Sequence, residues 1–498
     1  MSASLPRALR SSWTWLLMGA LLLPFASSQT VIPAAAWLAP VCLLRFTRNA
    51  SRGRVAWGAV LLAYAFGIAF GLRNGLAPLP LVGIGLVALV SGLFRSLAYV
   101  ADRTLAPSLA GIRRSLVFPA AMTGVEWVFA LLSPYGSWGS SGYSQAGNLP
   151  LLQILSVTGL WGLTFLIHWL APVVDALLDE KPGPALRPAA AFGVVLAGVL
   201  LFGGTRLAFF PPRGNPVPVA AVSLSVSEYD RAFAGWKYRE IARASLPERT
   251  GLRPQLAAAQ ELLLARTQAA AQAGARIVSW PESTPVLEED LDALLEKGGT
   301  LARRERLHLV MTPWVIRRTG RFPFVENLSV LVDPEGRVRW RYPKTYPVLG
   351  IEEGKFGRGP GIVPQAEIPS GRLASVICQD LDFPGLVRQA GRSRAGLLIG
   401  PADDWPAVQT THAQMAVFRA IENGTSLLRP TNNGISLAVD PQGRILGATG
   451  SQAQAAPLLL SALPLSGTTT LYSLAGDWFA YVCLAGLGAV LVIVKRNS

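Results

Sequence analysis

The chain has 498 residues, of which 51% are hydrophobic and only 15% are charged, and its mean hydropathy is +0.37. A soluble enzyme usually carries about 25% charged residues, so the composition argues against a fully soluble protein. The net charge of +15 would suit a nucleic-acid binder. However, residues 206–475 hold 30 basic and 24 acidic residues, a net charge of only +6, without an aromatic-basic motif.

Apolar runs dominate the first 205 residues and return near the carboxyl end. We predict eight membrane spans, at 12–28, 31–46, 55–75, 78–100, 115–133, 152–174, 189–205 and 476–494. A span needs about 20 apolar residues, so the second run is short. The sequence at 24–28 resembles a signal-peptide cleavage region, but further spans follow at once, which favours an uncleaved anchor.

Basic residues cluster in alternate connections between these runs. Among the short connections on the opposite side of the membrane, only Arg73 is basic. This asymmetry predicts that both termini are cytoplasmic and that the large polar domain is external. We therefore expect a transmembrane bundle at 1–205, an external domain at 206–475 and a final span with a cytoplasmic tail at 476–498. The basic residues assigned to the cytoplasm are Arg7, Arg10, Arg45, Arg48, Arg52, Arg54, Arg95, Arg103, Arg113, Arg114, Lys181, Arg187, Lys495 and Arg496.

Cysteine and histidine are rare. Cys42 and Cys483 lie in predicted spans, and only Cys378 lies in the external domain. Three cysteines are too few for a disulfide framework. The three histidines show no ligand spacing with cysteine, and no glycine-rich phosphate loop follows a strand, so we predict neither a metal nor another cofactor.

Strand-like and helical runs alternate in the external domain, which predicts an α/β fold. Three reactive residues occupy similar places in it. Glu282 follows the predicted strand 275–280, Lys344 follows 337–342, and Cys378 ends 373–378. Residues at strand ends are well held and reach an open sheet edge. We therefore expect the three side chains to meet.

A thiol, a carboxylate and an amine in one place suit covalent acyl chemistry. The carboxylate takes the thiol proton, the thiolate attacks, and the ammonium stabilises the oxyanion. Taken singly, each residue also has a purely structural interpretation, because residues of these types often occupy turn, surface or packing positions. Spacing alone leaves both the structural and the catalytic interpretation open.

Several segments resemble the carbon–nitrogen hydrolase (nitrilase) superfamily, and more closely the apolipoprotein N-acyltransferase family within it. The likeness runs from about residue 118 to the carboxyl end. The segments that carry it are Trp138–Gln145, Gly159–Leu163, Ile277–Thr284, Asn327–Arg337, Tyr342–Lys344, Ser375–Cys378, Arg419–Gly424 and Arg429–Ser436.

The resemblance implies an external αββα domain with Glu282 as general base, Lys344 as oxyanion stabiliser and Cys378 as nucleophile. It also implies a supporting glutamate, for which Glu352 has the right spacing and Glu353 is a rival. The implied enzyme is a monomeric protein of the bacterial inner membrane. It would take a fatty acyl group from a phospholipid as a Cys378 thioester and pass it to the diacylglyceryl-cysteine amine of an apolipoprotein, without cofactor.

The chain departs from the family at positions that contact substrates. Asp380 replaces a glutamate after the nucleophile, and Ser223 and Ser225 replace Gln and Asn. The run after Lys344 differs, as does the segment 401–406, which contains Trp405. Trp236 matches a family acyl-pocket tryptophan only loosely. These departures leave two alternatives: a membrane-tethered amidase with water as acceptor, and a non-catalytic scaffold.

Glu126 lies within a predicted span. An acid inside a membrane is costly and is often functional. It can equally pair with another group near the membrane interface or bond to a neighbouring helix. The sequence leaves these roles open. The uncharged loop 133–150 beside this span contains aromatic residues, which fits either an interfacial belt or a lipid entry.

Overall fold

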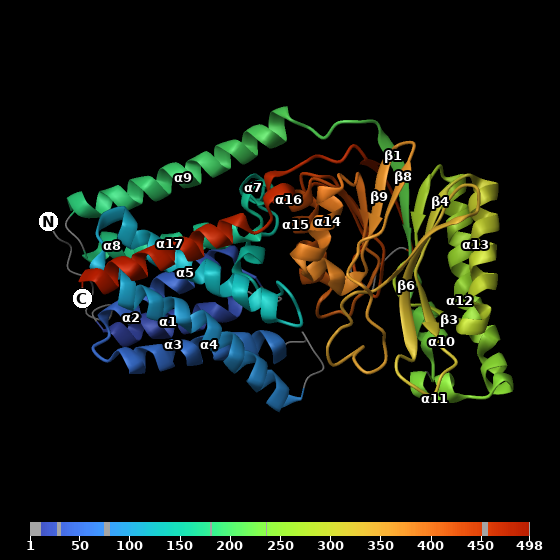
Figure 1. Ribbon diagram of the computed structural model, residues 1–498, viewed down its shortest axis with the longest axis horizontal. Coiled ribbons are helices and arrows are strands. Elements are labelled where there is room, and N and C mark those ends of the chain that lie inside the picture. The colour runs from blue at the N-terminus through green and yellow to red at the C-terminus, as the bar shows by residue number, and fades with distance from the viewer. Residues whose placement is uncertain are drawn as a thin grey trace. The chain divides into compact units, whose positions relative to one another are not determined.

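The computed structural model describes residues 11–26, 31–73, 80–179, 182–235, 237–450 and 457–497 (Figure 1). The chain forms two compact units, one of Met1–Phe210 with Ala475–Ser498 and the other of Pro211–Leu474. These bounds differ by a few residues from the predicted 206–475.

The first unit is a bundle of apolar helices. Within the described residues, six helices are long and apolar enough to cross a membrane: Gly53–Gly71, Leu81–Ser108, Gly111–Leu132, Leu160–Asp179, Pro184–Phe209 and Trp478–Arg496. The first two predicted spans form shorter helices, because the apolar helix Ser12–Phe25 and α2 (Pro33–Asn49, 17 residues) fall below that length. A membrane protein is thus confirmed, and eight crossings remain a prediction.

The predicted span 152–174 was wrong at its start. Two short helices, α6 (Leu149–Leu152) and α7 (Leu155–Thr158), precede the long helix α8 (Leu160–Asp179). Gly159 separates them with φ of 62°, a conformation that glycine adopts without a steric penalty. The apolar run continues through this break, so hydropathy alone did not reveal it.

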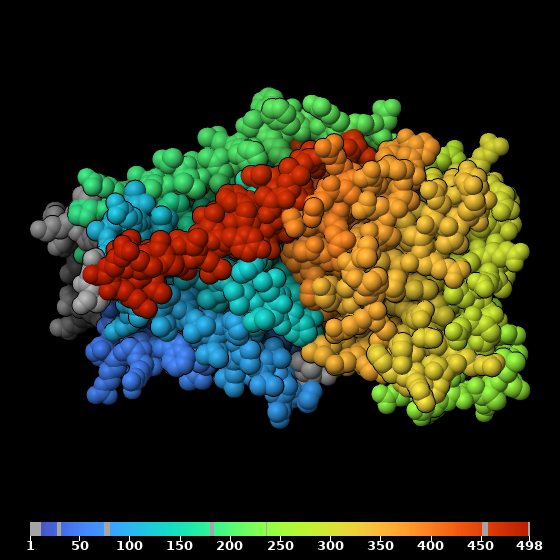
Figure 2. Space-filling view, viewed as in Figure 1, coloured from blue at the N-terminus to red at the C-terminus, as the bar shows by residue number. Residues whose placement is uncertain are grey.

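The outer surface of this bundle is strongly apolar. In α17 (Trp478–Asn497), the red ridge across the bundle in Figure 2, Tyr481, Val482 and Val492 are each at least half exposed. Only 11% of the apolar window of α17 is buried inside the protein, and 17% of that of α9 (Pro182–Phe209). Apolar helices exposed in this way are suited to contact with lipid.

Glu126, in α5 (Gly111–Leu132), is 3% exposed and is bound on several sides. It accepts hydrogen bonds from the backbone N–H and Oγ of Ser141, both at 3.1 Å to Oε2, and from Thr164 Oγ1. The Arg95 guanidinium lies 3.8 Å from its other oxygen and donates to the carbonyl of Gly139. Glu126 therefore anchors the loop after α5 to its neighbouring helices.

Replacing Glu126 with alanine should loosen this loop, because the Ser141 N–H and the Arg95 guanidinium would lose a buried acceptor. An unsatisfied buried donor costs about 2 kcal/mol. Limited proteolysis of the nanodisc-embedded protein should show faster cleavage within residues 133–148. Asp179→Ala, which removes a half-exposed partner of Arg45, is the matched control. Equal cleavage of both variants would contradict the anchoring role.

The second unit contains two packed β-sheets. The larger sheet has the order β16–β1–β2–β4–β6–β5–β3, and β7 also pairs with β6. Its strands are β1 (Pro216–Val222), β2 (Ile277–Ser279), β3 (Thr284–Leu287), β4 (His308–Met311), β5 (Pro313–Ile316), β6 (Val325–Val332), β7 (Val338–Pro343) and β16 (Leu458–Pro464).

The smaller sheet has the order β15–β14–β12–β10–β9–β8. Its strands are β8 (Gln365–Ile368), β9 (Gly371–Ser375), β10 (Leu397–Ile399), β12 (Ser426–Arg429), β14 (Leu437–Val439) and β15 (Ile445–Ala448). A separate parallel pair joins β11 (Ala402–Asp403) to β13 (Thr431–Asn432).

Apolar side chains from both sheets meet in one core, in which Val219, Ile277 and Leu331 pack with Leu373, Leu397 and Leu428. The outer face of the larger sheet is covered by α12 (Leu246–Gln272) and α13 (Leu291–Glu305). The helices α14 (Pro384–Arg392) and α15 (Gln409–Asn423) cover the smaller sheet (Figure 1). The predicted αββα fold is confirmed.

Candidate active site

Lys344 lies between two carboxylates in the interior of the second unit. It follows β7, and its side chain is only 1% exposed. Its ammonium nitrogen lies 2.8 Å from Glu282 Oε1, and 3.0 and 2.8 Å from the two carboxylate oxygens of Glu352. Glu352 also accepts a hydrogen bond from the N–H of Val348. Glu352, not the exposed Glu353, is therefore the partner of the lysine.

Glu282 is fixed by two asparagines that the sequence reasoning had not assigned. Asn327, on β6, donates to Glu282 Oε1 at 2.6 Å, and Asn432, on β13, donates to the Glu282 carbonyl at 2.9 Å. Both asparagines lie in segments that resemble the family, but the resemblance did not assign them a role. Their bonds hold the carboxylate toward Lys344.

We predicted that Cys378 is the last residue of a strand, and this prediction is wrong. β9 ends at Ser375, and Cys378 opens the 3₁₀ helix η7 (Cys378–Asp382) with φ of 49°. A non-glycine residue seldom adopts this left-handed conformation, which persists only when its surroundings enforce it. The Cys378 N–H donates to the Pro401 carbonyl at 2.8 Å. The turn holds the thiol in place, and the residue is 6% exposed.

The charges of neighbouring groups shift the ionisation of Lys344 and of Cys378. Burial lowers the pKa of Lys344, but the nearby Glu282 and Glu352 carboxylates outweigh it and hold that pKa well above its ordinary value. Burial raises the pKa of the Cys378 thiol, and the negative charge of Glu282 raises it further, whereas Lys344 lowers it. The resting thiol is protonated and lies within the field of a carboxylate and an ammonium.

Asp380 ties the nucleophile turn to the lysine loop. Its oxygens accept hydrogen bonds from the Tyr342 hydroxyl at 2.7 Å, from the Ile377 N–H at 3.0 Å and from the Tyr346 N–H at 2.9 Å. Burial raises the pKa of Asp380 to about 6, although these bonds oppose the shift. The shorter acid therefore has a structural task at this position.

Asp403, on β11, is partly buried and contacts Ser283, the residue after Glu282. It accepts hydrogen bonds from the Tyr229 hydroxyl at 2.5 Å, from Ser283 Oγ at 2.6 Å and from Asn433 Nδ2 at 3.0 Å. Ser283 itself has φ of 74°. Burial raises the pKa of Asp403 from 3.8 to about 7, so ionising this group costs stability at neutral pH.

Asp403→Asn should therefore make the folded protein more stable at pH 8 than the unmodified chain. The folded state keeps the Asp403 proton up to about pH 7, whereas the unfolded state releases it near pH 4. The unmodified protein loses stability as pH rises between these values, and the variant lacks this loss. Thermal unfolding at pH 4 and pH 8 measures the difference. A variant equally stabilised at both pH values would contradict this origin.

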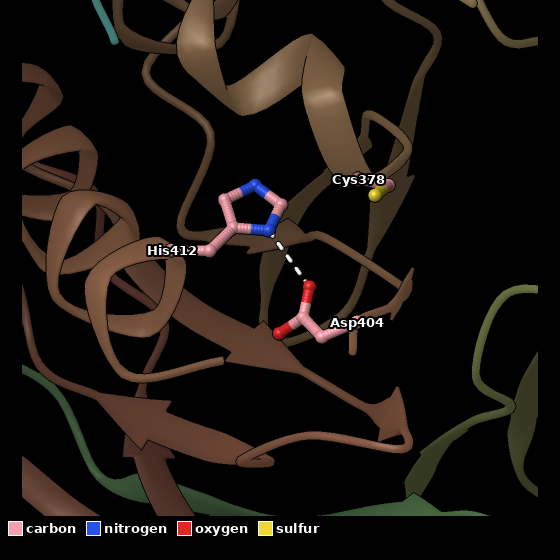
Figure 3. A group of neighbouring side chains, drawn as sticks. All are labelled: Cys378, Asp404 and His412. Atoms are coloured by element: carbon pink, nitrogen blue, oxygen red, sulfur yellow. Dashed lines mark hydrogen bonds and ion pairs between the residues drawn. The ribbon is translucent and has the colours of Figure 1, made fainter. Parts of the chain in front are cut away.

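A second buried cluster lies beside the nucleophile. Figure 3 shows Cys378, Asp404 and His412, whose Sγ, one carboxylate oxygen and one ring nitrogen lie within 4.8 Å of one another. His412 Nδ1 lies 2.8 Å from Asp404 Oδ1. The sequence showed no ligand spacing between histidine and cysteine, because α15 brings His412 to Cys378 from a distant part of the sequence.

A cysteine, a histidine and an aspartate are a donor set that zinc accepts. Here, however, Arg429 Nη2 lies 2.9 Å from both carboxylate oxygens of Asp404 and 2.9 Å from His412 Nδ1. The guanidinium already supplies the positive charge that a metal would bring to these atoms. The arrangement suits an internal ion pair better than a metal centre.

The remaining residues singled out from the sequence are Trp236, Trp405, Ser223 and Ser225. Trp236 lies outside the described residues. Trp405 is partly buried, and its carbonyl accepts the N–H groups of Val408 and Gln409 where α15 begins. Ser225 caps α10 (Val226–Phe233) through a mutual pair of bonds with Glu228. Ser223, in the same connection, is buried.

Comparison with known proteins gives two family matches and a solved structural neighbour. Residues 246–471 match the carbon–nitrogen hydrolase family, and residues 19–173 match the apolipoprotein N-acyltransferase N-terminal domain. A solved amidase from Nesterenkonia sp. is 22% identical, with a TM-score of 0.40, and the match covers 51% of this chain and 92% of the amidase.

Three curated relatives bear the name apolipoprotein N-acyltransferase. The protein from Bradyrhizobium diazoefficiens is 30% identical over 463 residues, covering 84% of this chain and 79% of the relative. The Geobacter metallireducens protein is 27% identical, covering 78% and 75%, and the Gloeobacter violaceus protein is 28% identical, covering 96% and 93%. The chain belongs to the apolipoprotein N-acyltransferase family.

Proposed function

We propose that the protein transfers a fatty acyl group from a phospholipid to the amino group of a diacylglyceryl-cysteine on an apolipoprotein, through a thioester on Cys378. The observation that carries the proposal is the buried ammonium of Lys344. It is bracketed by Glu282 and Glu352, and its charge and that of Glu282 act on the Cys378 thiol. Such an arrangement suits acyl transfer with an activated sulfur nucleophile.

In the first half-reaction, Glu282 takes the thiol proton and the Cys378 sulfur attacks the ester carbonyl of the phospholipid. Lys344 stabilises the negative oxygen of the tetrahedral intermediate. The carbon–oxygen bond then breaks, and the lysophospholipid leaves as an alcohol with the proton that Glu282 returns. The enzyme is left as the Cys378 thioester.

In the second half-reaction, the free amine of the acceptor attacks the thioester carbonyl. Glu282 accepts the proton that the nitrogen loses, and the sulfur leaves and recovers that proton as the thiol. The product is an amide, and the enzyme returns to its starting state. Because the two substrates bind in turn, the kinetics should be ping-pong.

The location of the two substrates favours a membrane-held enzyme. We infer that the catalytic unit lies on the external side of the bacterial inner membrane and that both termini are cytoplasmic, as the distribution of basic residues indicates. Donor and acceptor are both lipid-anchored, so an enzyme held in the same membrane meets them at a high effective concentration.

The acceptor separates this function from the amidase alternative. The purified protein in phospholipid nanodiscs is given a synthetic diacylglyceryl-cysteine peptide, and mass spectrometry measures N-acyl peptide and free fatty acid. We expect the N-acyl peptide to dominate, with none formed from a peptide whose amine is already acetylated. Release of fatty acid at the same rate with either peptide would identify water as the acceptor and contradict the proposal.

A further inference from the structure

The cluster of Asp404, His412 and Arg429 has no part in the two half-reactions, yet it lies against the nucleophile. Its residues come from three elements: Asp404 follows β11, His412 lies on α15 and Arg429 ends β12. The side chains of Asp404 and Arg429 are 1% and 0% exposed. A buried ion pair of this kind is costly to form, which suggests a role beyond filling space.

Asp404 and Arg429 compensate each other's charge. Burial raises the pKa of Asp404, but the Arg429 guanidinium and His412 outweigh it and hold that pKa below its ordinary value. Asp404 is therefore an anion at neutral pH. Both of its oxygens accept hydrogen bonds from the same guanidinium nitrogen at 2.9 Å, so the pair is nearly neutral as a unit.

The negative charge of Asp404 acts on the Cys378 thiol. It raises the pKa of Cys378, in the same direction as burial and Glu282 and against Lys344. Arg429 is the direct countercharge to Asp404. The charged groups that act on the thiol include Glu282 after β2, Lys344 and Glu352 after β7, and Asp404 after β11, and His412 on α15 lies near it.

We propose that Arg429 is a positioning residue that acts through Asp404 to set how readily the Cys378 thiol loses its proton. By pairing with Asp404, it keeps a bare carboxylate from opposing the thiolate. His412, 2.8 Å from the same carboxylate, fixes the direction of the pair. The inference rests on Cys378 as the nucleophile of the proposed function, and it concerns the ionisation of that thiol alone.

The test measures the pH dependence of Cys378 alkylation by iodoacetamide, with modified peptides quantified by mass spectrometry. Arg429→Gln should slow alkylation at pH 8 about threefold to tenfold, because Asp404 then loses its arginine countercharge. Asp404→Asn should accelerate it by a similar factor. The double variant should return near the unmodified rate, and Arg429→Lys should keep the unmodified profile.

These opposite signs separate the proposal from a purely structural role. If the network only supports the fold, Arg429→Gln and Asp404→Asn should shift the profile in the same direction, and that result would overturn the proposal. Should Arg429→Gln fail to fold, Asp404→Asn alone decides, because unchanged or slower alkylation contradicts it. Arg249→Gln, which breaks the ion pair of another buried arginine with Glu289, is the control and should leave the profile unchanged.

Alkylation needs neither phospholipid nor acceptor, so its outcome does not depend on the proposed acyl transfer. Loss of acyl transfer with an intact pattern of alkylation rates would reject the function and keep the electrostatic role. Normal acyl transfer without the opposite shifts would keep the function and reject the electrostatic role.

Discussion

Replacing Cys378 with alanine should lower acyl transfer by about four orders of magnitude or more, because the covalent route disappears with the nucleophile. The fold should remain intact, since the thiol is small and its backbone bond to Pro401 does not involve the side chain. Initial rates of N-acyl peptide formation in nanodiscs measure the effect.

The matched controls are Cys42→Ala and Cys483→Ala. Both cysteines are buried and free, as is Cys378, but they lie in the helical unit. Each variant should keep nearly full activity. A Cys378→Ala protein that retains a tenth of the unmodified rate would show that the sulfur is not the nucleophile.

Lys344→Met should remove activity and also destabilise the protein. Without the ammonium, the Glu282 and Glu352 carboxylates face each other in a buried site that has lost its positive charge. Removing one partner of a buried ion pair typically costs about 3–5 kcal/mol. The free energy of unfolding of the second unit, followed by denaturant titration in detergent, should fall by about that amount.

A second substitution separates the two effects. Lys344→Met combined with Glu352→Gln removes one of the opposed charges, so part of the lost stability should return. Activity should not return, because no group replaces the ammonium beside the oxyanion. Recovery of activity in the double variant, or a single variant as stable as the unmodified protein, would contradict the role given to Lys344.

The features predicted well from sequence were those carried by local pattern. Long apolar runs predicted the membrane helices, and alternating runs predicted the α/β unit, whose two sheets were implied by the family resemblance. Glu282 and Lys344 were expected after strands, and they follow β2 and β7. Glu352 was chosen over Glu353 from spacing in the related family, and it is the one that contacts Lys344.

The features missed depend on backbone geometry or on contacts between distant segments. Cys378 reads as part of a strand because Val376 and Ile377 are apolar, and only the structure reveals its turn with positive φ. His412 lies far from Cys378 in sequence, so no ligand spacing could have paired them. Gly159 interrupts an apolar run that hydropathy treats as continuous.

Some departures from the family acquire a physical reason in the structure. Asp380 is one methylene shorter than the usual glutamate, yet it gathers donors from both the nucleophile turn and the lysine loop. Asp404, in the altered segment after β10, carries a negative charge that Arg429 offsets. A single sequence showed that these positions differ but not which side chains compensate for them.

The most direct test of the central claim is the mass of the Cys378 peptide after the purified protein has been incubated with a phospholipid of defined acyl chains. We predict an adduct of one fatty acyl group on Cys378, cleaved by hydroxylamine as a thioester and discharged when the diacylglyceryl-cysteine peptide is added. An unmodified Cys378 in a preparation that still forms N-acyl peptide would contradict the thioester mechanism.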